Sequence, residues 1–558
     1  VLGSTDTGDV LTLLGGGSVI VEDVDSIIGQ AGQTETLTLA GTAASISVSA
    51  IDSVVGSTDT SESVTLLASG NISLQDVENL TGTGQTTDVA RLIGNGATLT
   101  VSDVASVIGS TGTDVVTMAT GTLAVANVDT VIGSSGADVL TLNSAGAVAV
   151  SDVESIVGQA GLTEVVTLEG SDAVVAESGV DTIIGTSGTG DHLTMGASGR
   201  LAVSAIESVT GSGSAQDVLS LLDNGATISV DTLASVVGST GTDVLTMAAG
   251  TLAVSGIETV VGSAGTDVLT LNAAGAVEVS DVETVIGQAG LVETITLAGA
   301  SGVVSVSAIN SVIGSSGSAD AVTLLASGAV ALQDVESITG TGAATDVATL
   351  LGTEAAITAA DMGTVIGTTG ADTVTMASAT VSVSGIESIV GSAGSTDVLS
   401  LTSGGAIDVT DVETVLGAAG AVDTVTFGDT GTHAVSSVES VVGTSGTDVL
   451  QLLAGGGVAI TTIETVLGST GTDVVTMLTA GTLAVSDVES VIGSADTTDE
   501  ITMLTEGTIS LAGIESVTGT TGDDRVNIAG GGSITVSGGS DAVDSIVGSN
   551  NAVEIVTL

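Results

Sequence analysis

Gly262-Ser-Ala-Gly-Thr-Asp267-Val-Leu-Thr-Leu271 is a glycine-rich turn that ends in one acid and continues into a run of β-forming residues. Equivalent turns occur 22 times in the 558 residues, and each has Asp or Glu at the position of Asp267. We call these residues the turn acids. A unit that recurs at a fixed period of 20–50 residues indicates a solenoid, a propeller or an array. The repeat therefore decides the fold.

A glycine that ends a V-x-G step, here called the step glycine, measures the period. From Gly29 the successive spacings of the step glycines are 27, 26, 27, 24 and 25, and the next five spacings are identical. Gly29, Gly158 and Gly287 therefore begin matching five-repeat blocks, and the residue number advances by 129 from each to the next. The third block ends at Gly417 after an advance of 130, and later spacings are 25 to 29. No linker interrupts the series, which predicts one continuous domain over residues 1–558.

Short β-strands are expected within each repeat. Leu252 and Val254 alternate with small residues, as in a strand with one buried face. Ile257 and Val260 follow at a spacing of three, which suggests corners, and residues 268–271 form a second β-rich segment. No 3.6-residue stripe persists. The fold class predicted is all-β, a parallel β-solenoid (β-helix) of about 22 coils with 24–29 residues and two or three strands per coil.

The composition excludes several classes of partner. The chain has 65 acidic and only three basic residues, with no Lys, and a formal charge of -62. Nucleic acid and anionic membrane surfaces both require clustered basic residues, so neither is expected as a partner. No apolar run approaches the length of a membrane-spanning helix, so membrane insertion is not expected either. Such acidity is typical of disorder, but a hydrophobic content of 43% indicates an ordered chain.

In a solenoid the turn acids are expected to stack in one line along an edge. Carboxylates about 4.8 Å apart repel one another, and a cation would relieve this repulsion. Oxygen ligands without His or Cys select calcium over zinc. The turn acids that are Glu are Glu35, Glu62, Glu164, Glu293 and Glu554. The candidate metal ligands are the turn acids that are Asp: Asp9, Asp88, Asp114, Asp138, Asp191, Asp217, Asp243, Asp267, Asp320, Asp346, Asp372, Asp397, Asp423, Asp448, Asp473, Asp499 and Asp524.

The turn resembles the repeats-in-toxin (RTX) nonapeptide G-G-x-G-x-D-x-U-x. Gly109-Ser-Thr-Gly-Thr-Asp114-Val-Val-Thr and Gly238-Ser-Thr-Gly-Thr-Asp243-Val-Leu-Thr match it except at the second glycine. The motif occurs here once per roughly 26 residues, whereas RTX rolls repeat it every nine, so the resemblance covers the turns and not the coil between them. It is closer to surface proteins related to RTX toxins. It implies secretion from a Gram-negative bacterium and calcium-dependent folding.

A second interpretation of the turn acids stays open beside metal binding. An acid after a glycine turn can accept backbone N–H groups and fix the turn. Another acid recurs in the V-E-S step, and we call it the step acid. A solvated face that opposes aggregation is expected for these residues, because Ala105, Ala234, Asn310 and Gly363 interrupt the series. The step acids are Asp25, Asp52, Glu78, Asp129, Glu154, Asp181, Glu207, Glu258, Glu283, Glu336, Glu387, Glu413, Glu439, Glu464, Glu489, Glu515 and Asp544.

No residue set predicts an enzyme. His192 and His433 are far apart and are expected to face solvent, and no serine has a repeat-related His–acid partner. Acid pairs of the glycosidase type would lack an aromatic platform, since Phe427 is the only aromatic residue. The three arginines, Arg91, Arg200 and Arg525, are expected after strands or in turns, paired with nearby acids. Ice binding is not expected, because each coil has only one outward Thr and not the paired Thr lattice of an ice-binding protein.

These observations predict a structural extracellular protein at a bacterial cell surface: a stiff rod, filament, surface layer or adhesin stalk, with calcium as its candidate cofactor. Expected partners are further copies, end to end or laterally, and a cell-surface or matrix polysaccharide. The segment opens on Val1 within a repeat, which predicts that it belongs to a longer or polymerising protein. The alternative is a calcium-dependent folding and secretion module of RTX type that serves an effector domain outside this segment.

Overall fold

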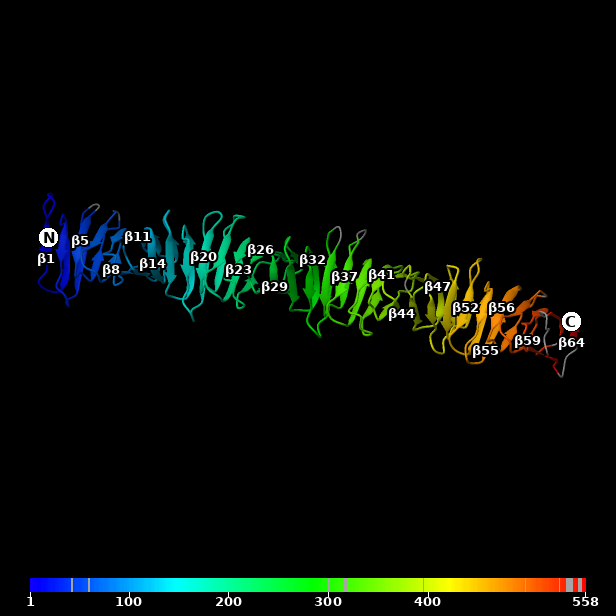
Figure 1. Ribbon diagram of the computed structural model, residues 1–558. Coiled ribbons are helices and arrows are strands. Elements are labelled where there is room, and N and C mark those ends of the chain that lie inside the picture. The colour runs from blue at the N-terminus through cyan, green and yellow to red at the C-terminus, as the bar shows by residue number, and fades with distance from the viewer. Residues whose placement is uncertain are drawn as a thin grey trace. The chain divides into compact units, whose positions relative to one another are not determined.

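The computed structural model describes residues 1–41, 44–58, 61–299, 302–315, 319–394, 396–496, 498–530, 532–537, 545–549 and 554–557. The chain forms two compact units, Val1–Val282 and Glu283–Leu558. Throughout the described residues the regular elements are β-strands, β1 to β32 in the first unit and β33 to β64 in the second. Each unit is a parallel β-solenoid, and Figure 1 shows its strands stacked one after another.

Each sequence repeat contributes three strands. In the first unit, the repeat around the quoted turn forms β29 (Gly250–Ser255), β30 (Thr259–Val261) and β31 (Asp267–Leu271). We call them the long strand, the short strand and the acid-led strand. The corner predicted after Ser255 is confirmed, since Gly256 has φ +65°. The V-x-G step, expected only to turn the chain, is itself the short strand.

The strands alternate between two parallel sheets, so that odd-numbered strands form one sheet and even-numbered strands the other. Thus β29 pairs with β31, with Gly250 beside Asp267. The intervening β30 pairs instead with β28 (Val244–Met247) and β32 (Gly275–Ser280). Each turn of the solenoid therefore contains two strands, whereas each sequence repeat contains three.

This mismatch corrects the predicted coil. A turn has roughly 18 residues in place of the predicted 24–29, and the turns are correspondingly more numerous than the predicted 22 coils. Three strands per repeat and two strands per turn mean that one repeat makes one and a half turns. The sequence period differs from the structural period because the short strand has only three residues, too few to show the alternation of a strand.

The interior of each unit is filled mainly by Val, Leu and Ile, with Met and a few Ala. Inward residues alternate with outward ones along each strand, and Leu245, Val260 and Leu269 are completely buried. Inward residues of one turn lie in register with inward residues of the next, as Val260 does with Leu245 and Val279, and this stacking removes apolar surface from water at each step. Among the described residues no helix is long and apolar enough to cross a membrane.

One interior contact departs from the aliphatic pattern. Phe427 at the end of β49 (Asp423–Phe427) stacks on His433 of β50 (Thr432–Ser436), with ring centroids 3.8 Å apart. His433 is 3% exposed, and its Nδ1 and Nε2 lie 3.1 and 3.3 Å from the carbonyl oxygens of Val412 and Asp429. The expectation that His433 faces solvent was therefore wrong. It occupies an inward strand position, where the carbonyl contacts replace the lost hydration of the ring nitrogens and stacking on Phe427 contributes packing energy.

Candidate functional site: the turn and step acids

The turn acids are buried, which the sequence did not predict. Those that are Asp have no exposed surface, apart from Asp524 at 1% and the half-exposed Asp9. Glu35, Glu62, Glu164 and Glu293 are completely buried as well. Burial of an ionised carboxylate is energetically costly unless hydrogen bonds or counter-ions compensate for the lost hydration. Their contacts therefore decide what these residues do.

Asp243 illustrates how a turn Asp is held. Its Oδ2 accepts the backbone N–H of Ser239 at 2.5 Å, and the Ser239 hydroxyl lies 3.0 Å from both carboxylate oxygens. Its Oδ1 accepts the N–H of Ala226, in the preceding turn of the solenoid, at 2.7 Å. The carboxylate thus closes its own glycine turn and links it to the turn before. These are the contacts expected of a capping residue.

The step acid continues the same chain of contacts. The backbone N–H of Asp243 donates to Glu258 Oε2 at 2.9 Å. Equivalent bonds of 2.7–3.1 Å recur in the described repeats of both units. The step acids are exposed or half-exposed, as expected for a solvated face, but they are also hydrogen-bond acceptors. Asp544 lies outside the described residues.

The interruptions in the step-acid series have a structural explanation. Where the step residue is Ala105, Ala234 or Gly363, the preceding turn acid donates its N–H to a carbonyl three residues earlier in its own turn, at 3.0–3.1 Å. Those turns contain a glycine with positive φ, at Gly84, Gly213 and Gly342, which allows the tighter path. At Asn310 the side-chain Oδ1 replaces the carboxylate and accepts the N–H of Glu293 at 2.9 Å.

The turn acids do not form the predicted single line. Asp114 precedes β13 (Val115–Met118) in the odd sheet, and the next turn acid, Asp138, begins β16 (Asp138–Leu142) in the even sheet. Successive turn acids therefore alternate between the sheets, and those on one sheet are three strands apart. At about 4.8 Å per strand that separation is about 14 Å. The expected repulsion along a dense ladder is absent because a repeat makes one and a half turns.

The first turn of each block differs from the others. Most turns have Ser or Thr directly after the step glycine, whereas Gln30, Gln159, Gln288 and Ala418 occupy this position in the turns of Glu35, Glu164, Glu293 and Asp423. In each of these four acids one buried carboxyl oxygen has no hydrogen-bond partner. Asp448 Oδ1 is also without one, although the Thr444 hydroxyl serves Oδ2. Glu62 Oε2 shows the same feature although the Ser57 hydroxyl donates to Oε1, so the missing hydroxyl marks four of these turns in the sequence and not all of them.

The pKa directions differ between individual turn acids. Burial raises the pKa of Asp88 and of Asp346, but hydrogen bonds from the hydroxyls and N–H groups of Thr83 and Thr341 more than offset this, so both pKa values are lowered. In contrast, burial raises the pKa of Glu164, and the facing Asp181 carboxyl raises it further. The pKa of Asp423 is raised by burial and then by the charge of Glu439.

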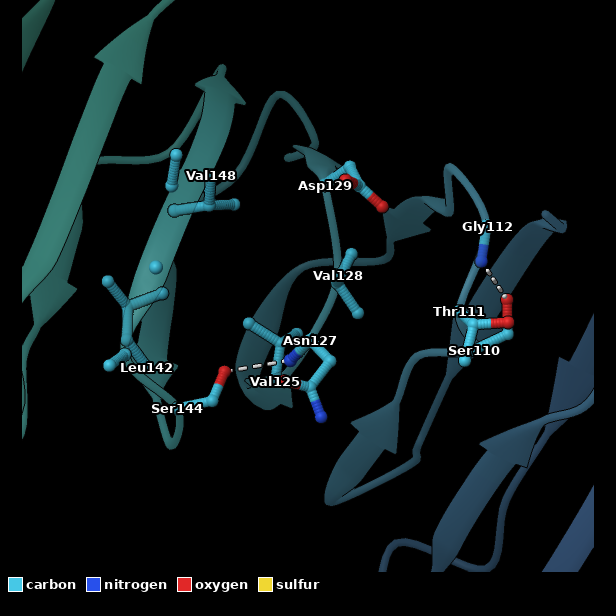
Figure 2. A pocket seen from close by; sticks show the side chains of 13 residues that line it. Ser110, Thr111, Gly112, Val125, Asn127, Val128, Asp129, Leu142, Ser144 and Val148 are labelled. Carbon is cyan, nitrogen blue, oxygen red and sulfur yellow. Dashed lines mark hydrogen bonds between the residues drawn. The ribbon is translucent and has the colours of Figure 1, made fainter. Parts of the chain in front are cut away.

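Small cavities lie beside the corners. The one in Figure 2 has about 200 Å³ and lies between the turn Ser110–Gly112 and the corner at Asn127–Asp129. The Asn127 N–H donates to Ser144 Oγ at 2.8 Å, and the Gly112 N–H donates to Ser110 Oγ at 3.2 Å. Val125, Val128 and Leu142 supply an apolar wall. The polar groups that could orient a ligand are thus largely engaged with each other.

In the part of the chain that the structure describes, no group of three or more His, Cys, Asp or Glu side chains has the arrangement of a metal site. The arginines lie within strands at exposed positions, in β10 (Val89–Leu92), β23 (Arg200–Ser204) and β61 (Arg525–Ile528), not in turns. Arg525 donates to Asn527 Oδ1 at 3.2 Å. His192 is half-buried, with Nδ1 3.0 Å from the Ser208 hydroxyl.

Comparisons with protein-family models, curated proteins and solved structures found no match for this chain. Its architecture is nonetheless plain from the strand pairing: the chain is a parallel β-solenoid repeat protein whose turns are closed by buried acids.

Proposed function

We propose that this chain is a structural repeat protein of a bacterial exterior, where it serves as a stiff rod, filament, surface layer or adhesin stalk. The observation that carries the proposal is the role of the acids. Turn and step carboxylates accept backbone N–H groups from their own turn and from neighbouring turns of the solenoid. The parallel ladders and the apolar interior hold the same turns together. The described side chains thus serve stiffness, and the proposal includes no catalytic activity.

Further copies of the chain are the partners that this function requires, joined end to end or laterally, and a cell-surface or matrix polysaccharide is a candidate attachment. The formal charge of -62 opposes lateral contact. Added salt shortens the range of this repulsion, with a Debye length of about 8 Å at physiological ionic strength. Lateral assembly is therefore expected to increase with ionic strength.

Electron microscopy of the whole chain at low and physiological ionic strength tests the proposal. Extended particles or fibres are expected, with more lateral association at the higher salt. A compact, monodisperse particle under both conditions would contradict a structural role. Digestion by a protease that cleaves after small apolar residues is a second measurement. The chain should resist it, and resistance to trypsin alone would be uninformative because only three residues are basic.

The RTX-type calcium module is the competing function, and the same protein distinguishes the two. In the structural proposal the turn Asp residues act as caps, since N–H and hydroxyl donors already contact both oxygens of Asp243. Circular dichroism and thermal melting should then be the same in millimolar calcium and in excess chelator. A melting point lowered by tens of degrees on chelation would instead support calcium-coupled folding.

A further inference from the structure

We propose that the first turn of the second 129-residue block contains a proton-binding site, in which Glu164 shares one proton with the facing step acid, Asp181. This inference does not depend on the proposed function. Its starting point is Glu164 Oε2, a buried oxygen without a hydrogen-bond partner.

The contacts explain why this oxygen lacks a donor. In an ordinary turn Asp138 Oδ1 accepts the N–H of Gly121 at 2.9 Å, and Oδ2 accepts both the N–H and the hydroxyl of Ser134 at 2.6 and 2.9 Å. Glu164 accepts only the N–H of Gln159, at 3.1 Å on Oε1. Two donors present in the Asp138 turn are therefore missing.

The first missing donor is the hydroxyl, which Gln159 lacks. The second is the N–H of the neighbouring long strand. In the turn of Glu164 the Gly146 N–H donates to the carbonyl oxygen of Thr163 at 3.0 Å. The same diversion occurs at Gly17 with Thr34 and at Gly405 with Val422, at 2.9 and 3.1 Å. The longer side chain of Glu, or the absence of a hydroxyl at Ala418, thus leaves one buried oxygen of the carboxyl group without a donor. If the carboxyl is ionised, this oxygen stays unsatisfied.

The groups around Glu164 leave a proton as the simplest compensation. On one side the paired residue is Gly146, which has no side chain, and on the other it is Asp181, whose Oδ2 accepts the Glu164 N–H at 3.1 Å. Asp181 is the titratable group that faces Glu164. Glu35 lies between Gly17 and Asp52 in the same way, and Asp423 between Gly405 and Glu439. A buried carboxyl beside a second, more exposed carboxyl ionises only at an energetic cost, because burial and the neighbouring like charge both disfavour its charged form.

The third block supports this assignment by its composition. There the residue that faces Glu293 is Asn310, at the position of Asp52 and Asp181. An amide has the shape of a protonated carboxyl and is neutral as well. An ionised carboxyl, in contrast, carries one negative charge. The pair Glu293–Asn310 therefore reaches without a proton the charge that the pair Glu164–Asp181 reaches by binding one. Burial and the facing carboxyl also raise the pKa of Glu164, in agreement with proton uptake.

Proton binding fixes the sign of the pH effect. A carboxyl whose pKa is raised on folding stabilises the folded state below its unfolded pKa, and this contribution is lost as the pH rises through the folded value. The variant Glu164→Gln imitates the protonated form at every pH. We expect its unfolding temperature to equal or exceed that of the wild type at pH 8, with a smaller difference between pH 5.5 and pH 8.

Asp138→Asn is the matched control, because it removes the same charge from an acid whose oxygens accept N–H and hydroxyl donors. It should lower the unfolding temperature at pH 8. If Glu164→Gln lowers it by as much as Asp138→Asn does, the turn uses the ionised carboxylate and the proposal is wrong. If calcium or sodium stabilises the wild type at pH 8 but not Glu164→Gln, a cation and not a proton occupies the site, which also overturns the proposal.

A spectroscopic measurement keeps the test independent of how the variants fold. Infrared spectra of the whole chain at neutral pD should retain a protonated-carboxyl C=O band. The spectra should be recorded in the Glu177→Gln variant, because Glu177 is another carboxyl with a raised pKa and would contribute to the same band. The band should weaken further in Glu177→Gln/Glu164→Gln. If the Glu177→Gln spectrum has no such band at neutral pD, the pair Glu164–Asp181 is ionised and the proposal fails.

Discussion

Gly262 lies directly against the carbonyl oxygen of Asp281, so that a Cβ on Gly262 would be 1.9 Å from that oxygen. Asp281 is the corner residue of the following long strand and has φ +53°. The same approach recurs at other step glycines, such as Gly109 against Asn127 and Gly133 against Asp152. The glycine in the V-x-G step is therefore required by the close stacking of two turns and not by its own backbone angles.

Gly262→Ala should consequently destabilise the first unit by roughly 1–3 kcal/mol, since the backbone of one turn must shift away from the other. Gly199→Ala is the control, because a Cβ at Gly199 meets no atom within 4 Å. Thermal unfolding of the two variants measures the difference. Equal unfolding temperatures would show that the turns are not packed as closely as described.

Loss of a step acid should destabilise the solenoid at some repeats and not at others. Glu258→Ala removes the acceptor of the buried Asp243 N–H, which should cost about 1–3 kcal/mol. The converse change, Ala234→Glu, should have little effect, because the Asp217 N–H already donates to the Ser214 carbonyl oxygen at 3.1 Å. Amide hydrogen exchange measures the protection of a single amide and therefore tests both changes. The Asp243 amide should lose protection in Glu258→Ala, while the Asp217 amide stays protected in Ala234→Glu.

Glu177 should make the first unit less stable as the pH rises towards 7. This residue is 2% exposed on β20 (Val174–Ser178), and burial raises the pKa of its carboxyl from 4.5 to about 7, with a further contribution from the charge of Asp217. Its stabilising contribution is complete below pH 4.5 and is lost as the pH rises through about 7. A shift of this size corresponds to about 3 kcal/mol.

Glu177→Val tests this, since Val48 and Val306 occupy the equivalent positions in the first and third blocks. The variant should melt at a higher temperature than the wild type at pH 8, and the gap should narrow at pH 5. A gap that is independent of pH would mean that Glu177 does not titrate in this range.

Asp346 should give the opposite pH dependence. Its pKa is lowered, because hydrogen bonds from Thr341 and Gly328 offset the effect of burial. Stability from this group is therefore present above its unfolded pKa of 3.8 and is lost as the pH falls through the folded value. The variant Thr341→Val removes the hydroxyl donor and should move the onset of acid unfolding in the second unit to a higher pH. Circular dichroism between pH 2 and 5 measures the onset, and no change would contradict the assigned contact.

The sequence predicted the solenoid class because alternation in residues such as Leu252 and Val254 and the repeated turn survive in every block. It did not predict the number of strands per turn. The short strand Thr259–Val261 has one inward residue, Val260, and alternation over three residues cannot be told from a corner. Because the short strand was not predicted, the turn acids were wrongly expected to lie in one line. The burial of Asp243 depends on contacts with residues one turn away, such as Ala226, which are not local in sequence.

The odd number of strands in a repeat has a consequence for recognition. Within each unit, a repeat and its successor are related approximately by a half-turn combined with an advance, which is a pseudo-twofold screw. Duplication of a five-repeat block, also an odd number, exchanges the two sheets: Glu35 begins β4 (Glu35–Leu39) in the even sheet and its counterpart Glu164 begins β19 (Glu164–Leu168) in the odd one. Within the first unit, duplication of the first block thus copied the side chains of one sheet onto the other. A ligand that recognises this block would find equivalent binding surfaces on both sheets of that unit.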